Sequence, residues 1–359
     1  MNLNKLSLFI LAGALALSII ACKKDEETST APSVNGSLKF SVPAYVAPHS
    51  KLTMKPQGVT HPDGGEIGYF WKVTPSMTKN DTTRYDNGLD INGKPSDGTF
   101  EFTFPDSLKT FSIYAYAYAK GYSNVSASKQ CTVVSGGLEE SITNLGIASK
   151  ASSQEVIGGK TYYYTTIGDN DWMMTNIADH AAGAPYRNCT AMSEVFGRFY
   201  SYKEALTVCP EGWTLPSEAD WMALADAAGA EDVEAYGNIS GVAAALMGNA
   251  YFNGARMWEY WPSVGDITNQ TGLSAIAAGF AMLGQKNAAP QENAHIEYSY
   301  PNAIFKGYQE YAAFWTADLV PDEDGMAYYR YIIFDQPDLM IAKGDINTFG
   351  ASVRCIRKK

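Results

Sequence analysis

Between residues 36 and 135, short apolar runs alternate with clusters of Gly, Pro, Asn and Asp. The runs read SLKFSV, KLTMKP, IGYFWKVTP, TFEFTFP, TFSIYAYAYAKGY and KQCTVVS. They show no helical periodicity, and short strands separated by turn residues are typical of a β-sandwich. We therefore predict an all-β sandwich over residues 35–135.

Two of these runs also predict which side chains form the core of the sandwich. In GYFWKV, strand alternation places Tyr69, Trp71 and Val73 on one face. Trp71 is then the expected core aromatic between two sheets. Phe100, Phe102 and Phe104 alternate in the same way in a later strand.

The segment Ile113–Lys120 alternates between bulky and small side chains. Tyr114, Tyr116 and Tyr118 share one face, and Ile113 shares the other with three alanines. Exposed tyrosines could stack on sugar rings. Because aromatic residues are favoured in strands, we expect instead that the tyrosines pack against the opposite sheet.

Beyond residue 156, two helices are predicted within Val195–Leu224. In the first, apolar residues recur at helical spacing, and Pro210 with Gly212 ends it; this stripe is Tyr202, Ala205, Leu206 and Cys209. The second helix begins at Ser217, three residues before Asp220, as in a capping box. Its apolar stripe is Trp221, Leu224, Ala225 and Ala228.

The last residues, GASVRCIRKK, read as a strand. Val353 and Cys355 share the face directed at a core, and Arg354 points the other way. Residues 136–156 show only a weak apolar pattern, and we interpret them as a linker between two domains.

The N-terminus has the layout of a signal peptide over residues 1–21. Lys5 precedes an apolar run from Leu6 to Ile20, and Ala21 stands directly before Cys22. The run is too short for a comfortable bilayer span, which needs about 20 apolar residues. Residues 22–34 are polar and read as a solvated tether.

Ile19–Cys22 resembles the bacterial lipobox, and the resemblance implies that Cys22 is acylated and becomes the anchored N-terminus. The charged run after Cys22 also resembles the surface-export signal of Bacteroidetes lipoproteins. We therefore expect a lipoprotein anchored in the outer membrane and facing the cell exterior. A periplasm-facing lipoprotein, or an ordinary signal peptide with a chance cysteine, are the alternatives.

Composition narrows the possible partners. The 359 residues carry a net charge of -11 and 23 tyrosines against 4 histidines, so a nucleic-acid partner is disfavoured. C-x-x-C, H-E-x-x-H, G-x-x-x-x-G-K-[ST] and G-x-S-x-G do not occur, which lowers the expectation of an enzyme.

Four cysteines remain besides Cys22, and they allow three pairings: Cys131, Cys189, Cys209 and Cys355. A disulfide between Cys209 and Cys355 would tie the first helix to the last strand. In the chain-entropy model such a long loop contributes about 4 to 5 kcal/mol of stability. Two buried free thiols are the alternative.

The N-terminal region resembles the immunoglobulin-like or PKD-like modules of bacterial surface proteins. The shared patterns are Y-x-W-x-V at Tyr69–Val73 and A-x-A-x-G-Y at Ala117–Tyr122. The resemblance implies a spacer or interaction module.

From Tyr162 to the C-terminus a series of short pieces follows the order of one known domain: Asn170–Met173, Asn176, Phe196–Tyr200, Cys209–Trp221, Asn269, Gly272–Ala275, Gly279 with Phe280, Ala313–Thr316, Tyr328–Arg330 and Ser352–Cys355. On these pieces the chain resembles the Fibrobacter succinogenes major paralogous domain, related to C-type-lectin-like and formylglycine-generating-enzyme folds. The resemblance implies an α+β C-type-lectin-like domain over residues 157–359. Formylglycine-generating enzymes work through cysteines near the C-terminal part of this domain. Cys355 alone lies there, so we expect no catalysis.

C-type lectins hold calcium through acidic and amide side chains, and two loops offer such oxygen ligands. One contains Gln336-Pro337-Asp338 and Asp345, and the other contains Asp318, Asp322 and Asp324. Turn chemistry and a solvated acidic loop are the simpler interpretations. No cofactor is expected, and calcium is kept as a weak alternative.

The loop 251–261 is dense in aromatic residues and could stack on a glycan or grip a protein; its candidates are Arg256, Trp258, Tyr260 and Trp261. These aromatics could equally pin an irregular loop. We expect a non-catalytic surface lipoprotein that binds a glycan or a protein. An enzyme of the formylglycine-generating type and a structural subunit of a surface assembly are the alternatives.

Overall fold

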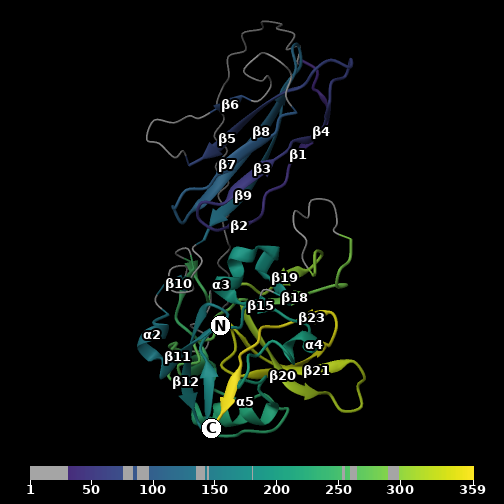
Figure 1. The fold of residues 1–359 in the computed structure, drawn as a ribbon. Helices are drawn as coiled ribbons and strands as arrows, with labels where there is room; N and C mark the ends of the chain where they lie inside the picture. Colours follow the sequence, from purple (N-terminus) through teal and green to yellow (C-terminus); the bar gives the residue numbers. More distant parts are fainter. Residues whose placement is uncertain are drawn as a thin grey trace, which may run out of the picture.

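A computed structural model describes the chain from residue 31 onward, except for residues 76–83, 87–96, 135–141, 144, 180, 253–254, 259–264 and 290–298. For residues 84–86 and 142–143 it describes the backbone only. Cys22 and most of the predicted tether therefore lie outside the described residues. Two bodies follow one another along the long axis of the molecule (Figure 1). We name them the sandwich (residues 31–134) and the head (residues 142–359).

The sandwich is built from β-strands only, as predicted. A five-stranded sheet has the order β2-β9-β8-β5-β6, with bounds β2 Tyr45–Val46, β5 Gly68–Thr74, β6 Arg84–Asp86, β8 Thr110–Tyr118 and β9 Val125–Val133. Two antiparallel pairs accompany it: β3 (Lys51–Met54) with β7 (Phe100–Thr103), and β1 (Asn35–Lys39) with β4 (Gln57–Thr60).

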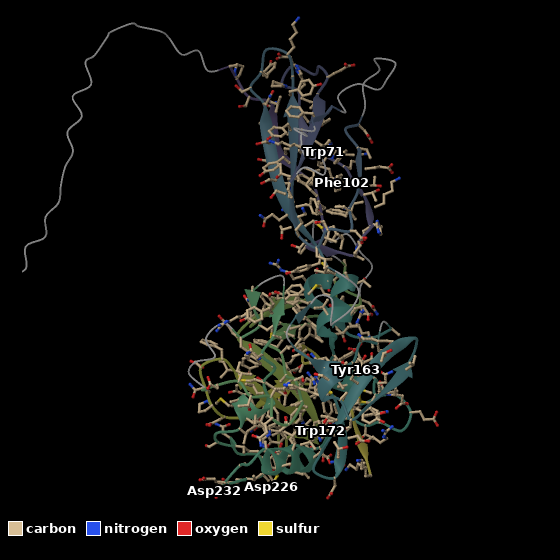
Figure 2. The ribbon with its side chains drawn as sticks, turned by 90° about the vertical axis from the view of Figure 1, so that its left-hand side faces the viewer. Trp71, Phe102, Tyr163, Trp172, Asp226 and Asp232 are labelled. Atoms are coloured by element: carbon tan, nitrogen blue, oxygen red, sulfur yellow. A yellow bond between two sulfur atoms is a disulfide. The ribbon has the colours of Figure 1, made fainter. Side chains whose placement is uncertain are left out.

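The core of the sandwich confirms the alternation predicted for β5 and β7. Trp71 is 0% exposed, and its indole N–H donates to the Gly98 carbonyl at 2.9 Å. Phe100, Phe102 and Phe104 are buried in the same core cluster, and Figure 2 shows Phe102 close to Trp71. Stacked and edge-to-face ring contacts join these side chains, which adds to the free energy gained from burial.

The prediction for the tyrosines of β8 was wrong. The buried residues of this strand are Phe111, Ile113, Ala115 and Ala117, and the tyrosines between them are half-buried on the outer face of the sheet. The reason is volume, because Trp71 and the phenylalanines already fill the space between the sheets. Small side chains on β8 leave room for those rings.

The head is also mostly β-structure, with fewer and shorter helices than an α+β domain was expected to have. Its largest sheet has the order β11-β12-β13-β24, with bounds β11 Ser153–Ile157, β12 Lys160–Ile167, β13 Asn170–Met173 and β24 Ile356–Lys358. The last residues of the predicted linker, 153–156, therefore belong to β11 of this sheet.

Two three-stranded sheets complete the centre of the head. One consists of β20 (Tyr311–Leu319), β21 (Met326–Ile333) and β22 (Met340–Asp345), and the other of β19 (Ile304–Lys306), β18 (Phe280–Met282) and β23 (Phe349–Gly350). Smaller pieces are β10 (Ile142–Thr143), β16 (Tyr251–Phe252), β17 (Ala255–Arg256), β14 (Ala184–Pro185) and β15 (Arg198–Phe199).

Of the two predicted helices, the second is confirmed. α5 (Glu218–Ala227) begins after Ser217, whose side chain and that of Asp220 form the predicted capping box. The first is only a single turn, α4 (Tyr202–Ala205), and Leu206 is 51% exposed rather than on a buried face. The other short helices are α2 (Ile147–Lys150), η1 (Tyr186–Asn188), η2 (Thr190–Met192), α3 (Ser193–Phe196) and α6 (Ala243–Leu246).

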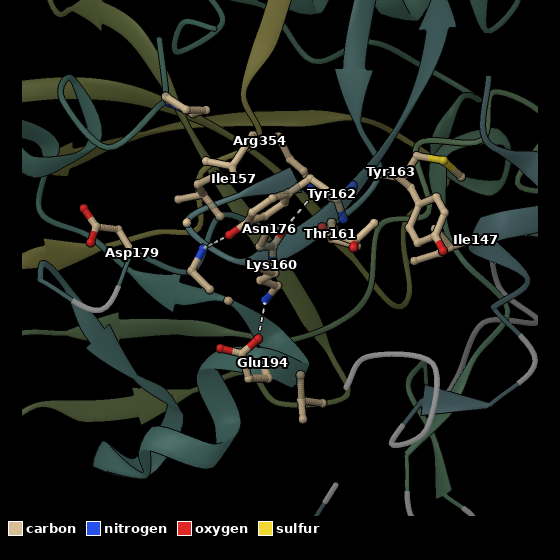
Figure 3. Close-up of a pocket in the computed structure, with 18 of the residues that line it drawn as sticks. Ile147, Ile157, Lys160, Thr161, Tyr162, Tyr163, Asn176, Asp179, Glu194 and Arg354 are labelled. Carbon is tan, nitrogen blue, oxygen red and sulfur yellow. Dashed lines mark hydrogen bonds and ion pairs between the residues drawn. The ribbon is translucent and has the colours of Figure 1, made fainter. Parts of the chain in front are cut away.

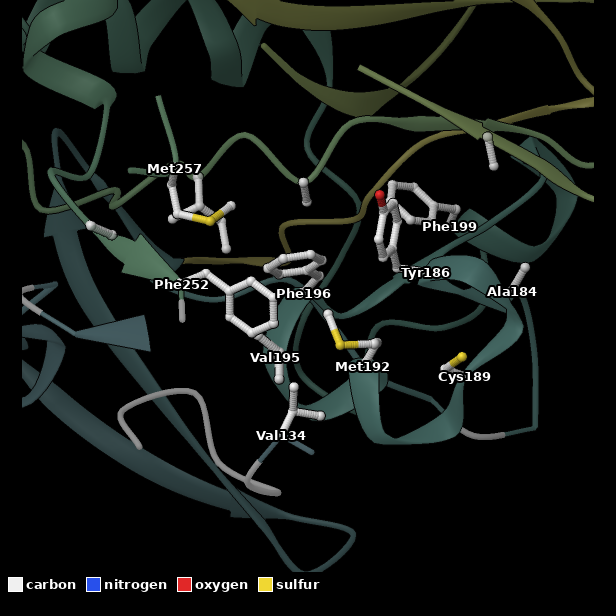
Figure 4. Packing of buried hydrophobic residues seen from close by; sticks show 14 of the residues in the cluster. Val134, Ala184, Tyr186, Cys189, Met192, Val195, Phe196, Phe199, Phe252 and Met257 are labelled. Carbon is white, nitrogen blue, oxygen red and sulfur yellow. The ribbon is translucent and has the colours of Figure 1, made fainter. Parts of the chain in front are cut away.

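The sandwich and the head share a packed joint, formed by Tyr45 and Val134 on the sandwich side. The ring of Tyr45 lies 6.1 Å from that of Tyr186 and 6.2 Å from that of Phe252. Val134 is 1% exposed and belongs to the same apolar cluster as Val195 of α3 (Figure 4). Apolar burial therefore favours a fixed arrangement of the two bodies.

Within the described part of the chain, we find no helix with the length and apolar character needed to cross a bilayer.

Candidate functional site

The head contains a cavity of about 960 Å³, a volume in the range of small-molecule pockets. Its walls come from the β11–β12 hairpin, the segment after β13, α3, the segment after α4, and Arg354 near the C-terminus (Figure 3). One edge of the cavity is the turn between β11 and β12, at Gly158 and Gly159. Both glycines have positive φ, and a Cβ added to either would meet no atom within 4 Å.

Arg354 forms the floor of the cavity and is 1% exposed. Its guanidinium donates to the Asn176 side-chain oxygen at 2.7 Å, to the carbonyl of Met173 at 3.1 Å and to that of Ser274 at 3.2 Å. A further bond goes to the carbonyl of Leu273. Burial lowers the pKa of Arg354 to about 9, so the side chain remains charged at neutral pH.

These bonds join segments that lie far apart in the sequence. Asn176 also donates to the Phe196 carbonyl at 2.8 Å and to the Ser352 hydroxyl at 3.1 Å. Several pieces on which the sequence resemblance rested, namely those that contain Met173, Asn176, Phe196, Leu273 and Ser352, are thus joined directly or through Asn176 to one buried guanidinium. These bonds connect walls of the cavity.

The mouth of the cavity carries charged side chains of both signs. Lys160 of β12 and Glu194 of α3 form an ion pair at 3.0 Å, with side chains 22% and 26% exposed. Asp179 lies on the opposite side, where one carboxylate oxygen accepts the backbone N–H of Ala181 at 2.8 Å. These groups can orient a polar part of a ligand.

The side chain of Tyr162 lines the cavity between Lys160 and Arg354 (Figure 3). Its hydroxyl accepts the backbone N–H of Ala178 at 3.2 Å, and the ammonium of Lys160 lies 5.4 Å from the centre of its ring. Burial raises the pKa of Tyr162 to about 12. The phenol is therefore neutral at physiological pH, and its hydrogen bond to the backbone of Ala178 holds it in place.

The predicted disulfide is present. Cys209 and Cys355 are bonded, with their Cα atoms 5.7 Å apart and a sequence separation of 146. Cys131 and Cys189 are buried free thiols. Burial raises both thiol pKa values, that of Cys131 to about 12, so neither thiol forms a reactive thiolate near neutral pH.

The two described candidates of the aromatic loop, Arg256 and Trp258, do not form an exposed site together. Trp258 is 1% exposed, and its indole donates to the Ala275 carbonyl at 3.1 Å, so its role is to pin the loop. Arg256 is exposed on β17, with its guanidinium 6.0 Å from the centre of the Tyr251 ring. Tyr260 and Trp261 lie outside the described residues.

The acidic residues considered as weak calcium ligands accept backbone hydrogen bonds in separate parts of the head. Asp318 accepts the Glu218 backbone N–H at 2.7 Å, Asp338 accepts that of Gly241 at 3.1 Å, and Asp345 accepts those of Asn347 and Thr348 at 2.9 Å. Asp322 and Asp324 are exposed in the turn between β20 and β21. Among the described residues, no group of three His, Cys, Asp or Glu side chains is placed to share a metal ion.

The cavity itself was not predicted from the sequence. Its mouth residues, Lys160, Asp179 and Glu194, are single charged positions with no motif around them. The available signal was Gly158–Gly159 between two strand-like runs, which marks a tight hairpin. The two glycines predict a turn, but they do not predict which other segments of the chain lie across the cavity from it.

Comparisons with known proteins give one family match. The model of the Fibrobacter succinogenes major domain matches residues 165–357. No curated protein matches the chain. Among solved structures, a superoxide reductase (neelaredoxin) from Ignicoccus hospitalis aligns over 28% of this chain and 82% of that chain, at 15% sequence identity and a TM-score of 0.20. That likeness is too low to bear on fold or function.

Proposed function

Because the chain belongs to the Fibrobacter succinogenes major domain family, we propose that it is a non-catalytic surface lipoprotein whose head binds a glycan or a protein. The observation that carries the proposal is the cavity of about 960 Å³, which has a charged mouth and a rigid floor. In this proposal the head has a C-type-lectin-like fold, and the sandwich is an immunoglobulin-like or PKD-like spacer.

The position of the first described residues supports a display role. Ser123, in the turn between β8 and β9, donates to the carbonyls of Ala31 and Pro32 at 2.7 and 2.8 Å. This turn is at the end of the sandwich farthest from the head (Figure 2). A tether leading from Cys22 to this point would leave the whole sandwich between the lipid anchor and the cavity.

Two observations argue against catalysis by a formylglycine-generating mechanism. Cys355 is bonded to Cys209 and 0% exposed, so it does not offer the thiol that such a mechanism needs. The family-signature residues Asn176 and Arg354 are taken up by internal hydrogen bonds. Fold likeness to an enzyme alone is not evidence of activity.

The binding proposal is tested with the chain from residue 31 onward, which contains every described element. The purified protein is applied to glycan arrays and to arrays of extracellular proteins, with calcium and with a chelator. We expect reproducible binding to one class that is unaffected by the chelator. Absence of binding on both arrays would contradict the proposal.

The anchor is tested by the substitution Cys22→Ser in the full-length protein. Lipid attachment at this cysteine predicts that the variant loses all radiolabelled palmitate and leaves the membrane fraction. Protease treatment of intact cells then reports whether the unmodified protein faces the exterior. Equal palmitate labelling of Cys22→Ser and the unmodified protein would refute this anchor.

A further inference from the structure

Most of the aliphatic residues in the cavity wall are part of the packed interior of the head. They are buried in its apolar clusters: Leu145, Ile147, Met174, Ile177, Val195, Val208 and Ile276. The lining residues that remain accessible are mainly polar residues and glycines: Gly158, Gly159, Lys160, Thr161, Tyr163, Thr175, Asp179 and Glu194. Ile157, Ala181 and Pro210 are the accessible apolar ones. A ligand in the cavity therefore meets mainly hydrogen-bonding groups.

Some of these groups have hydrogen-bonding capacity to spare. One carboxylate oxygen of Asp179 accepts the Ala181 N–H, and the other has no partner within the described part of the chain. The side-chain hydroxyls of Thr161 and Tyr163 also make no hydrogen bond to a described residue. The Oγ1 atom of Thr175, in contrast, is buried and out of reach of a ligand. Because a sugar hydroxyl both donates and accepts, a hydroxyl-rich ligand can bond to a carboxylate and to hydroxyls alike.

The charges around the cavity favour a neutral ligand. Lys160 and Glu194 cancel each other in their ion pair, which leaves further N–H donors on the ammonium. The guanidinium of Arg354 is enclosed by the oxygens to which it donates, so it is not available to an anion. The carboxylate of Asp179 and the chain net charge of -11 oppose the approach of an anion. Sugars that carry carboxylates are therefore disfavoured.

The polar groups are spread along the cavity. Figure 3 shows Asp179 and Tyr163 at opposite ends, with Lys160 between them. Tyr163 is half-buried against the apolar cluster of the joint, and no stacked contact joins its ring to another ring in the described part of the chain. The accessible part of this ring can pack against the C–H groups of a sugar. A volume of about 960 Å³ leaves room for more than one sugar ring.

From these observations we infer that the cavity binds a neutral oligosaccharide of more than one sugar ring. One ring of the ligand packs on Tyr163, and hydroxyls farther along bond to Lys160 and to the free carboxylate oxygen of Asp179. This inference rests on the proposed binding function and narrows its ligand from a glycan or a protein to a neutral glycan.

Matched neutral and acidic sugars test the inference on the protein used for the arrays. The glycan array carries mannose, galactose and glucose oligosaccharides of one to six rings beside the uronic-acid oligosaccharides of the same linkages. Titration calorimetry then measures the affinity of each sugar that binds. We expect a neutral tetrasaccharide to bind at least tenfold more tightly than its monosaccharide and than its acidic counterpart.

Two variants of the cavity have matched controls elsewhere on the head. We expect Asp179→Ala to weaken binding of the neutral tetrasaccharide about tenfold, and Asp169→Ala to leave it unchanged, because Asp169 is exposed and does not line the cavity. Tyr163→Leu keeps an apolar side chain but removes the ring and the hydroxyl, and should also weaken binding about tenfold. Its control is Tyr236→Leu, since Tyr236 is 44% exposed and lies outside the cavity lining. Thermal unfolding of each variant confirms that the head is intact.

Acidic sugars that bind as tightly as the neutral ones, or monosaccharides that bind as tightly as tetrasaccharides, would overturn the inference. A neutral sugar whose affinity is unchanged in both Asp179→Ala and Tyr163→Leu would also overturn it, because that sugar binds outside the cavity. If the protein array alone gives a ligand, the inference fails and the proposed binding function stands. If both arrays are empty, both fail.

Discussion

Replacement of Arg354 by methionine is expected to lower the free energy of unfolding of the head by about 3 to 5 kcal/mol. Methionine fills similar space but donates no hydrogen bond. The substitution leaves the Asn176 side-chain oxygen and three backbone carbonyls buried without their donor. Removing the buried charge offsets part of this loss of stability, because a buried charge is itself unfavourable. The free-energy cost of four buried acceptors without a donor is larger.

Urea unfolding monitored by tryptophan fluorescence and circular dichroism measures this effect. Arg256→Met is the matched control, because Arg256 is exposed on β17, and we expect it to change stability by about 0.5 kcal/mol or less. Arg354→Lys should fall between the unmodified protein and Arg354→Met, since an ammonium cannot reproduce the planar fork of donors. An unchanged urea midpoint for Arg354→Met would show that the acceptors find other partners.

Loss of the disulfide in the double variant Cys209→Ala/Cys355→Ala is expected to cost about 4 to 5 kcal/mol in the chain-entropy model. The reason is the length of the closed loop, since the two cysteines have a sequence separation of 146. Without the bond, the segment after α4 and the segment before β24 are no longer joined in the unfolded chain. The entropy of unfolding therefore rises.

The measurement compares chemical unfolding with and without a thiol reductant. The reductant should lower the stability of the unmodified protein to that of the double variant, and should leave the double variant unchanged. Cys131 and Cys189 are already thiols, so they offer the reductant nothing to reduce. A further loss of stability in the reduced double variant would mean that these two cysteines are bonded in solution.

Local sequence signals predicted local structure well. The capping box at Ser217 predicted where α5 begins, because that signal depends only on neighbouring backbone groups. The alternation around Trp71 predicted a buried tryptophan, because strand geometry places Tyr69, Trp71 and Val73 on one face and Lys72 on the other. Each prediction needed information from a few adjacent residues.

Predictions that depended on what lies opposite an element were less successful. The tyrosines of β8 face outward because the space inside was already taken by rings from β5 and β7. Trp258 is buried because Ala275, from a distant segment, accepts its indole N–H. The acidic residues Asp318, Asp338 and Asp345 cap different turns because the fold holds those turns apart.

The sequence by itself predicted an all-β sandwich, the start of α5 and, among three possible pairings, the disulfide between Cys209 and Cys355. It also motivates the anchor predicted at Cys22, which lies outside the described residues. Only the tertiary structure decided that Asn176, Leu273 and Arg354 meet, and that Ile157, Asp179 and Glu194 line one cavity. The physical reason is that local signals fix φ, ψ and side-chain alternation, whereas a cavity depends on the packing of segments that share no local signal.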